Sequence, residues 1–477
     1  MGKNLKVLFV SAEVAPYAKT GGLADVAGSL PEVLSGMGID IRVVFPGYRG
    51  IDAEQEYVAD FPVTIGNRLE TCILKRIKDA PVTTYTVNNY CYYYRDGIYM
   101  HHDDGERFSF LCRASLDLCR AIGFKPDIIH MNDWHSGPVA LLLKEQYKQR
   151  DSFFSNIKTV LTIHNLEYQG HFEKDILFLL GLPEELFTPE GVEFYGKFNF
   201  LKAGILYADK INTVSPTYSE EILTPEYGEG LEGVLFNRRK DLCGILNGIS
   251  HSQFNPETDV YLKYGYNEEN LSGKRRNKSL LQAELGLPVE NVPVVGVVHR
   301  LVLQKGLDLV IKAFDKMVEL GIQFILLGTG DPNLEKCFVS LMHKYPRQVA
   351  VRIEFNEELA HKIYSGSDIF LMPSRFEPCG LGQMISLRYG TIPLVRETGG
   401  LKDTVIDIGR DLTRGNGFTF SEYTPYAFLG ALQRAVEVYR NKPGLWLAMV
   451  KRGLKTDFSW ENSAKQYLNI YNSALRE

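Results

Sequence analysis

The stretch of residues 373–400 constrains the fold more than any other part of this chain. An apolar run at 368–372 leads into it, and a second apolar run at 392–395 lies near its end, with a segment of helical composition at 380–388 between them. Strand, loop, helix and strand in this order predict two parallel strands joined by a crossover. Ligands bind such units at the carboxyl ends of the strands, where a helix N-terminus suits a phosphate.

The same alternation recurs on both sides of residues 247–270, where Asn, Pro, Tyr and Gly are common. Strands are predicted at 5–10, 39–45, 128–131, 157–163, 210–214, 292–298, 323–327, 348–353, 368–372 and 391–395. Helices are predicted at 23–35, 108–122, 427–439 and 463–474, besides those that join the later strands. The pattern predicts an α/β protein built from two Rossmann-like, doubly wound domains.

We place the domain boundaries where the composition changes. The first domain is predicted to span 1–250 and the second 251–455, and a C-terminal helix at 456–477 is predicted to pack back on the first domain. Residues from about 56 to 105 alternate between apolar and polar and are rich in aromatic side chains. This segment is therefore predicted to be an antiparallel insertion in the first domain.

Charge and cysteine content exclude several classes of protein. The 53 basic and 58 acidic residues give a net charge of -5, which disfavours nucleic acid or an anionic membrane as a partner. The basic run at 274–278 is predicted to form an exposed helix face. The 7 cysteines are scattered without a C-x-x-C pair, and no apolar run has the length of a membrane span, so we expect a cytoplasmic protein.

Glycine and polar residues follow the predicted strands of the first domain. Gly21 and Gly22 permit close approach of a ligand to the backbone, and Lys19 can reach an anion above the start of the next helix. Asp133 and His164 follow two later strands. These positions predict a binding surface at one edge of the sheet, although a purely structural glycine turn and a packing role for His164 stay open.

The second domain carries cations at the equivalent edge. Arg300 and Lys305 share the loop after its first strand, where they can clamp a diphosphate. Gly330 ends the next strand, and the opening stretch adds Arg375 and Glu377. This set suits a nucleotide diphosphate sugar, and because the chain has no Asp-x-Asp motif we expect no metal ion to be required.

Ten motifs appear in the order in which a known family carries them: KTGGLADV, NDWHSG, TIHNLEYQG, KINTVSPTY, GLEGVL, ILNGI, RLVLQKGLDL, LGTGD, SRFEPCGLGQ and RYGTIPLVRETGGLKDT. Through them the chain resembles the bacterial glycogen synthases, which are related to plant starch synthases. The resemblance implies a GT-B fold, in which two Rossmann-like domains face a cleft. It also implies transfer of glucose from ADP-glucose to the non-reducing end of an α-1,4-glucan, with retention of configuration.

The resemblance also implies roles for individual residues. The catalytic residues would be Glu377 beside the transferring glucose, His164 near the reacting sugar, and Arg300 and Lys305 on the diphosphate. The substrate- and nucleotide-binding residues would be Lys19, Gly21, Gly22, Asp25, Asp133, Asn165, Asn247, Gly330, Phe355, Arg375, Cys379, Gly380, Leu381 and Gly382. Phe355 stands where relatives often carry an adenine-stacking Tyr, and no metal or other cofactor is implied.

Three residues depart from the family pattern: Ser250 replaces a usual Asp, Phe254 a usual Trp and Gly382 a usual Thr. Cys379 has no neighbouring base in the sequence, which favours a small pocket-lining residue over a nucleophile. Two alternatives stay open, a related enzyme that uses UDP-glucose or another acceptor, and a weakly catalytic glucan-binding paralogue. A dehydrogenase is disfavoured because the G-x-G-x-x-G at 228–233 follows no strand, and no oligomeric state is predicted.

Overall fold

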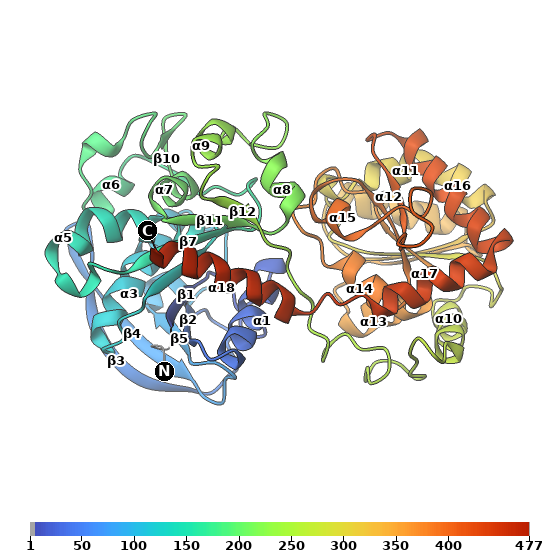
Figure 1. The fold of residues 1–477 in the computed structure, drawn as a ribbon, viewed down its shortest axis with the longest axis horizontal. Coiled ribbons are helices and arrows are strands. Elements are labelled where there is room, and N and C mark those ends of the chain that lie inside the picture. Colours follow the sequence, from blue (N-terminus) through green and yellow to red (C-terminus); the bar gives the residue numbers. More distant parts are fainter. Residues whose placement is uncertain (1–4, 477) are drawn as a thin grey trace. The chain divides into compact units, whose positions relative to one another are not determined.

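The computed structural model describes residues 5–476, and the chain divides into two compact units (Figure 1). Unit 1 takes in the chain up to Asn247 together with the residues from Trp460 onward, and unit 2 is Gly248–Ser459. The junctions predicted from the sequence are 250 and 455, each within five residues of these. Within residues 5–476 no helix combines the length and the apolar character that crossing a membrane requires.

Unit 1 is built on a nine-stranded sheet with the strand order β12-β11-β7-β6-β1-β2-β5-β4-β3. The strands are β1 Lys6–Val10, β2 Asp40–Pro46, β3 Gln55–Ile65, β4 Arg68–Ile77, β5 Thr84–Asn88, β6 Ile128–Asn132, β7 Lys158–Ile163, β11 Lys210–Thr213 and β12 Leu242–Gly244. From β12 to β5 neighbouring strands run parallel. The chain order runs outward from β1 in both directions, so the topological switch point lies between β1 and β6.

Helices cover both faces of this sheet, and its central strands are therefore buried; residues 7–10 of β1 and 128–132 of β6 are all fully buried. The helices of unit 1 are α1 Gly22–Gly36, α2 Tyr90–Tyr93, α3 Asp104–Ala121, α4 Pro138–Leu142, α5 Lys148–Arg150, α6 Ile176–Leu179, α7 Phe200–Tyr207, α8 Pro216–Glu221, α9 Glu232–Asn237 and α18 Trp460–Arg476. Short turns of other helix types are η1 Trp134–Ser136, η2 Leu143–Tyr147, η3 Ser152–Phe154 and η4 Glu184–Leu186. A small antiparallel sheet joins β8 His171–Phe172, β9 Glu193–Phe194 and β10 Lys197–Asn199.

The aromatic segment at 56–105 differs from the predicted insertion. β3 and β4 do form an antiparallel hairpin, but β4 pairs with β5, and β5 runs parallel to β2 in the main sheet. The tyrosines that follow lie in and after the short helix α2, where the Tyr93 hydroxyl donates to the carbonyl of Arg107 in α3. Local alternation predicts a hairpin but not the edge with which it pairs, so this segment extends the sheet rather than decorating it.

The C-terminal helix α18 belongs to unit 1, where it packs against α1 and β7 (Figure 1). A buried chain of hydrogen bonds fixes it to the sheet. The Tyr471 hydroxyl lies 2.7 Å from His130 Nδ1, and Asn212 Nδ2 donates to the Tyr467 hydroxyl at 3.2 Å. Both tyrosines are fully buried, so α18 is part of the core of unit 1.

Unit 2 is built on a six-stranded sheet with the order β15-β14-β13-β16-β17-β18, in which all neighbours run parallel. Its strands are β13 Val294–Val298, β14 Gln323–Leu327, β15 Val349–Arg352, β16 Ile369–Met372, β17 Ile392–Arg396 and β18 Phe418–Phe420. Its helices are α10 Ser272–Glu284, η5 Leu303–Lys305, α11 Leu307–Glu319, α12 Pro332–Lys344, α13 Glu357–Gly366, α14 Gly382–Arg388, α15 Gly399–Thr404, α16 Pro425–Asn441 and α17 Pro443–Lys455. The order is that of a doubly wound nucleotide-binding sheet, with its switch point between β13 and β16.

The basic run in α10 does not form one exposed face, as the sequence analysis expected. Lys274 Nζ donates to the carbonyls of Ser365 and Ser367, and burial lowers the pKa of Lys274 to about 7. Lys278 pairs with Asp368 at 2.6 Å. Residues four apart lie on one helix face, so these two lysines point inward while the arginines between them are exposed.

Candidate active site

A buried ion pair lies at the switch point of unit 2. Lys305 ends the loop after β13 and Glu377 lies in the loop after β16, and Lys305 Nζ is 2.6 Å from Glu377 Oε2. The two side chains are only 13% and 8% exposed, and the Ser374 hydroxyl donates to the same carboxylate oxygen at 2.9 Å. Burial would raise the pKa of Glu377, but the Lys305 ammonium, with smaller contributions from His299 and Ser374, holds that pKa below its ordinary value. Glu377 is therefore an anion at neutral pH.

Glycines allow these loops to interlock. Gly306 has a φ of 70°, and a Cβ there would lie 2.0 Å from the carbonyl oxygen of Pro373. Gly399 has a φ of 44°, and its Cβ would lie 2.0 Å from the carbonyl oxygen of Glu377. Other residues would force these backbones apart, so both glycines fix the position of the ion pair.

Four of the predicted residues of unit 2 lie after the carboxyl ends of neighbouring strands, at one edge of the sheet. Phe355 follows β15, Gly330 follows β14, Arg300 follows β13 and Glu377 follows β16, which is the order of these strands in the sheet. Three strand spacings of about 4.8 Å separate the first from the last by roughly 14 Å. Phe355 is 87% exposed, which leaves its ring free to stack on a flat group. The line of side chains thus runs from an aromatic ring through a cation to a carboxylate.

The loop after β16 supplies the other predicted residues of this unit. Arg375 is exposed, and its backbone N–H donates to the carbonyl of Gln304 at 2.8 Å, which ties this loop to the loop after β13. Cys379 is buried, and its carbonyl oxygen accepts a hydrogen bond from Gln383 Nε2 at 3.1 Å. Gly380 has a φ of 72°, and Leu381 precedes the first residue of α14. This helix therefore starts at the end of the loop, two residues later than the predicted start.

The presence of glycine at residue 382, the first residue of α14, has a steric explanation. A Cβ at this position would lie 2.9 Å from Cε1 of Phe370, whose side chain is fully buried. Because this ring lies in the core, a larger side chain at residue 382 requires repacking of the core. The glycine that replaces the family's usual Thr thus leaves room for the ring of Phe370.

The other two departures from the family pattern make local contacts. The ring of Phe254 stacks on that of His361 at a centroid distance of 5.1 Å, and the Ser250 and Ser252 hydroxyls lie 2.9 Å apart.

In unit 1 the loop after β1 is organised by Glu13, a residue that the sequence analysis did not select. Glu13 is buried, and its carboxylate accepts from the backbone N–H groups of Thr20 and Gly21 at 2.5 and 3.2 Å. The Tyr99 hydroxyl donates to the same carboxylate at 2.5 Å. A Cβ on Gly21 or Gly22 would meet no atom within 4 Å, so internal packing does not require glycine at either position. The open space beside them leaves room for a ligand.

Lys19 lies on this loop and pairs with Asp25 in the first turn of α1. The two charged atoms are 2.6 Å apart, and the side chains are 43% and 33% exposed. Such an exposed pair contributes little to stability and exchanges readily for another partner. Lys19 is thus available to a ligand anion.

His164 and Asp133 lie at the ends of β7 and β6. Asp133 Oδ1 accepts from the backbone N–H of His164 at 2.7 Å, and burial raises the pKa of Asp133 to about 7. His164 Nε2 lies 3.0 Å from Asn132 Oδ1, while Asn132 Nδ2 donates to the carbonyl of Val10. The amide orientation therefore makes Nε2 the protonated nitrogen of His164. Burial also lowers the pKa of His164 to about 3, so the ring is neutral at physiological pH.

The last two predicted residues of unit 1 also follow strands. Asn165 follows β7, and its side chain accepts from the N–H of Glu167 at 3.1 Å. Asn247 follows β12 and is 7% exposed, and its Oδ1 accepts no hydrogen bond within residues 5–476. A buried acceptor of this kind suits a hydroxyl-rich ligand.

Two further features of the described residues bear on function. No group of three or more His, Cys, Asp or Glu side chains within 5–476 is arranged to hold a metal ion.

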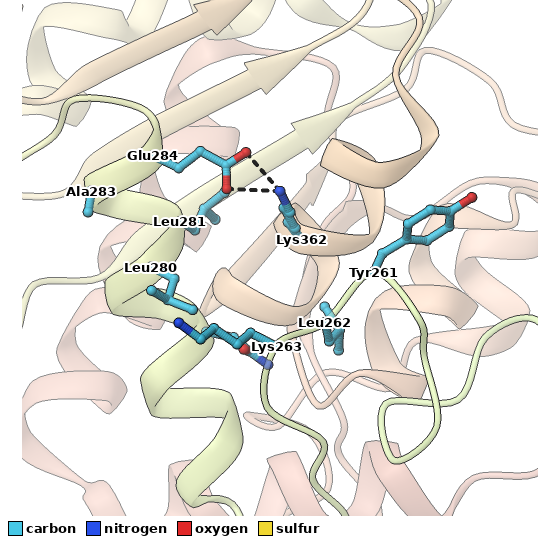
Figure 2. A pocket seen from close by; sticks show the side chains of 9 residues that line it. Tyr261, Leu262, Lys263, Leu280, Leu281, Ala283, Glu284 and Lys362 are labelled. Carbon is cyan, nitrogen blue, oxygen red and sulfur yellow. Dashed lines mark hydrogen bonds and ion pairs between the residues drawn. The ribbon is translucent and has the colours of Figure 1, made fainter.

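A cavity of about 350 Å³ in unit 2 lies between α10, α13 and residues 261–263, and Figure 2 shows the Glu284–Lys362 ion pair at its wall. No predicted site residue lines this cavity.

Sequence reasoning missed Glu13, Ser374 and Asn132. Glu13 bonds to Tyr99 and Asn132 to His164, both of which are distant in the chain. Ser374 bonds to Glu377 three residues later, through a loop conformation that the sequence does not reveal. Glu13 could have been selected from the sequence, since it lies between the first strand and the glycine pair. A buried carboxylate needs several hydrogen-bond donors, and the backbone N–H groups of a neighbouring glycine loop can supply them. An acidic residue just before such a loop was therefore the feature that could have indicated this role.

Comparisons with known proteins agree along the whole chain. A family model described as "Starch synthase catalytic domain" matches residues 6–237, and one described as "Glycosyl transferases group 1" matches residues 283–442. The chain is 50% identical over 480 residues to a glycogen synthase of Moorella thermoacetica, covering 100% of this chain and 98% of that protein. It is 49% identical to a glycogen synthase of Desulforudis audaxviator, covering 100% and 97%. The solved catalytic domain of Starch Synthase IV from Arabidopsis thaliana, bound to ADP and acarbose, matches with a TM-score of 0.94 at 35% identity, and each chain is covered completely.

Proposed function

We propose that this chain, which belongs to the glycogen synthase family, transfers glucose from ADP-glucose to the non-reducing end of an α-1,4-glucan with retention of configuration. The family relationship and the two-domain α/β fold of the GT-B class, both predicted from the sequence, are confirmed. The chain is a glycosyltransferase by this membership, and the roles of individual residues below are proposals.

The line of residues at the edge of the unit 2 sheet carries the proposal. An extended nucleotide diphosphate sugar presents a flat base, two phosphates and a sugar in that order. Phe355, the cations Arg300 and Lys305, and Glu377 follow strands in the same order. We therefore assign Phe355 to the adenine, Arg300 and Lys305 to the diphosphate, and Glu377 to the glucose.

The protonation states favour catalysis by charge stabilisation at the leaving group. When the bond between glucose and the diphosphate breaks, negative charge develops on the phosphate oxygens, and preorganised cations there are typically worth about 3 to 4 kcal/mol each. Glu377 is ionised and His164 is neutral at physiological pH, so neither is a strong proton donor. Arg300 and Lys305 supply the positive charge, and Lys19 of unit 1 is a further phosphate-binding cation in this proposal.

A transfer assay tests this function. Purified protein is incubated with glycogen and either ADP-glucose or UDP-glucose, and nucleotide release and chain extension are both measured. We expect both signals with ADP-glucose. Faster transfer from UDP-glucose would identify the related enzyme with the other donor, and nucleotide release without elongation, or no transfer at all, would reject the synthase.

We further propose that the reaction takes place in the cytoplasm. We also propose that it needs no metal ion. Arg300 and Lys305 provide the cationic charge that a divalent ion supplies in other nucleotide-sugar enzymes. We expect the same rate after dialysis against EDTA and after addition of Mg²⁺. A rate that falls with EDTA and returns with one divalent ion would show that these side chains are insufficient.

A further inference from the structure

Residues 254–266 of unit 2 form polar contacts with the C-terminal end of α14. Arg388, the last residue of this helix, donates from Nε to the carbonyl of Phe254 at 3.3 Å. The Tyr266 hydroxyl donates to the carbonyl of Tyr389, which follows the helix, at 2.8 Å, and both tyrosines are buried. The end of α14 is thus held by a segment that lies 123 to 134 residues earlier in the chain.

Asp259 lies at the centre of this contact, and its side chain is only 1% exposed. Its Oδ2 accepts from the Tyr389 hydroxyl and lies 2.7 Å from His361 Nδ1 in α13. Its Oδ1 accepts from the N–H of Tyr261 at 2.9 Å. Burial would raise the pKa of Asp259, but the hydrogen bonds from His361 and Tyr389 hold that pKa below its ordinary value. A buried anion holds its donors in place, because the loss of any donor leaves a desolvation cost unmatched.

The first turn of α14 holds the loop that carries Glu377. Gln383 is fully buried, and its Nε2 donates to the carbonyls of Cys379 and Gly380 at 3.1 and 2.9 Å. The helix has 7 residues, so it is roughly 10 Å long, and a helix this short within a packed core moves as one body. A shift of its last turn therefore shifts Gln383 and the loop with it.

We propose that Tyr389 is a positioning residue for the transfer reaction. Held by Asp259 and Tyr266, it fixes α14, and through Gln383 it fixes the loop that places Glu377 at the transferred glucose. The inference deepens the proposed function and rests on it, because that function assigns Glu377 to the glucose. A misplacement of about 1 Å at a reacting group can cost on the order of a hundredfold in rate, so a small movement of α14 has a measurable effect.

The test uses the full chain and the variant Tyr389→Phe, which removes one hydroxyl and keeps the buried ring. We expect kcat to fall roughly tenfold. The dissociation constant for ADP-glucose, measured by calorimetry without an acceptor, should rise by about threefold, while the KM for glycogen stays unchanged. Tyr266→Phe loosens the same end of α14 and should change these values in the same direction.

Gln282→Leu is the matched control for a loss of stability alone. Gln282 Nε2 donates to Gln323 Oε1 at 2.8 Å and to the carbonyl of Glu290 at 2.9 Å. These buried contacts lie at the amino end of β14, opposite the edge at which the donor residues lie. The control should lower the melting temperature and leave kcat and the affinity for ADP-glucose unchanged.

A double-mutant cycle tests whether Tyr389 acts through α14. The double variant Gln383→Met, Tyr389→Phe should have a kcat within about twofold of that of Gln383→Met alone, because the loop is already released. Single losses that multiply in the double variant would overturn the proposal. A Tyr389→Phe protein that melts at a lower temperature but keeps the parent's kcat and ADP-glucose affinity would also overturn it.

The remaining outcomes separate this inference from the proposed function. A rise in the KM for glycogen equal to the loss of donor affinity would mark a general disturbance and overturn the inference. If the parent protein binds ADP-glucose but transfers no glucose, the proposed function fails. Weaker binding of ADP-glucose by Tyr389→Phe would then still support the link between α14 and the donor loop, and unchanged binding would reject it.

Discussion

Arg300 and Lys305 differ in burial although both are assigned to the diphosphate. Lys305 lies in the buried pair with Glu377, whereas Arg300 is exposed and forms no ion pair within residues 5–476. Removing Lys305 leaves a buried carboxylate without its cation, which costs about 3 to 5 kcal/mol, whereas removing Arg300 has no such cost.

We therefore expect Arg300→Ala to lower kcat on the order of a hundredfold with an unchanged melting temperature. Lys305→Ala should lower both kcat and the melting temperature. The double variant Lys305→Met, Glu377→Gln removes both charges, so it should recover stability but not activity. Steady-state kinetics and thermal unfolding measure the two effects, and equal melting temperatures for the Arg300 and Lys305 variants would contradict the structural role of the ion pair.

Asp133 has a stability effect with a defined sign. Its pKa of about 7 in the native state lies above the ordinary value of about 3.9, so the native state retains a proton that the unfolded state has released. The free energy of unfolding therefore falls as the pH rises from about 4 to about 7. Asp133→Asn removes this cost, and Asn also tolerates the φ of 55° found here.

We expect Asp133→Asn to melt at least about 2 °C above the parent protein at pH 8, with a smaller difference at pH 5. Thermal unfolding at both pH values measures this. A difference that is equal at pH 5 and pH 8 would show that Asp133 does not titrate in this window.

At the level of elements, α18 stabilises unit 1 through hydrogen bonds as well as packing. Thr162 Oγ1 donates to Asn212 Oδ1 and so accepts from His130 Nε2, which makes His130 Nδ1 the acceptor for the Tyr471 hydroxyl. Burial lowers the pKa of His130 to about 3, in agreement with a neutral ring. Loss of the tyrosine hydroxyl leaves this buried nitrogen without a donor.

Tyr471→Phe is therefore expected to lower the free energy of unfolding by about 1 to 3 kcal/mol. Tyr426→Phe, at an exposed position, serves as the control and should have no effect. Chemical denaturation of both variants gives the two values. An unchanged midpoint for Tyr471→Phe would mean that the hydroxyl contributes nothing to the attachment of α18.

The elements that the sequence predicts well are those with a strong local pattern. The apolar run predicted at 292–298 is β13, and the helix predicted at 427–439 lies within α16, because burial on both faces or on one face leaves a periodic signal. Pairing between distant segments leaves no such signal. The pairing of β5 with β2, the contact between Glu13 and Tyr99, and the inward turn of Lys274 all depend on partners that are far away in the chain.

The residues of the candidate site also divide into those that the sequence predicts and those that only the structure reveals. Residues at strand ends, such as Arg300 and His164, can be selected because parallel strands place their carboxyl ends together. Their hydrogen-bond partners, such as Ser374 for Glu377 and Asn132 for His164, look like ordinary polar residues in the sequence. The protonation states of Glu377, Asp133 and His164 depend on burial, so the structure was needed to assign them.

For the whole molecule, the two units differ in continuity. Unit 2 is one uninterrupted segment with its own sheet and core, whereas unit 1 needs α18 from the end of the chain. The assigned donor residues Arg300, Lys305, Phe355 and Glu377 all lie in unit 2. The segment 248–459 should therefore fold alone and bind ADP.

We expect ADP at a hundred times its dissociation constant to stabilise this segment by about 2.7 kcal/mol, visible as a higher melting temperature. Maltohexaose should produce no shift. Phe355→Ala should reduce the shift if the ring stacks on adenine. A segment that folds but does not respond to ADP would contradict the assignment of the donor residues to unit 2.

The two ends of unit 2 lie side by side. The N–H of Ile249 donates to the carbonyl of Phe458 at 2.8 Å, and Ile249 forms a parallel bridge with Ser459. A unit whose ends meet can be replaced in the gene by the corresponding segment of a relative, with two short splices and no change to the topology of the host. The donor residues assigned to unit 2 are thus open to inheritance and to engineering as a cassette, independently of unit 1.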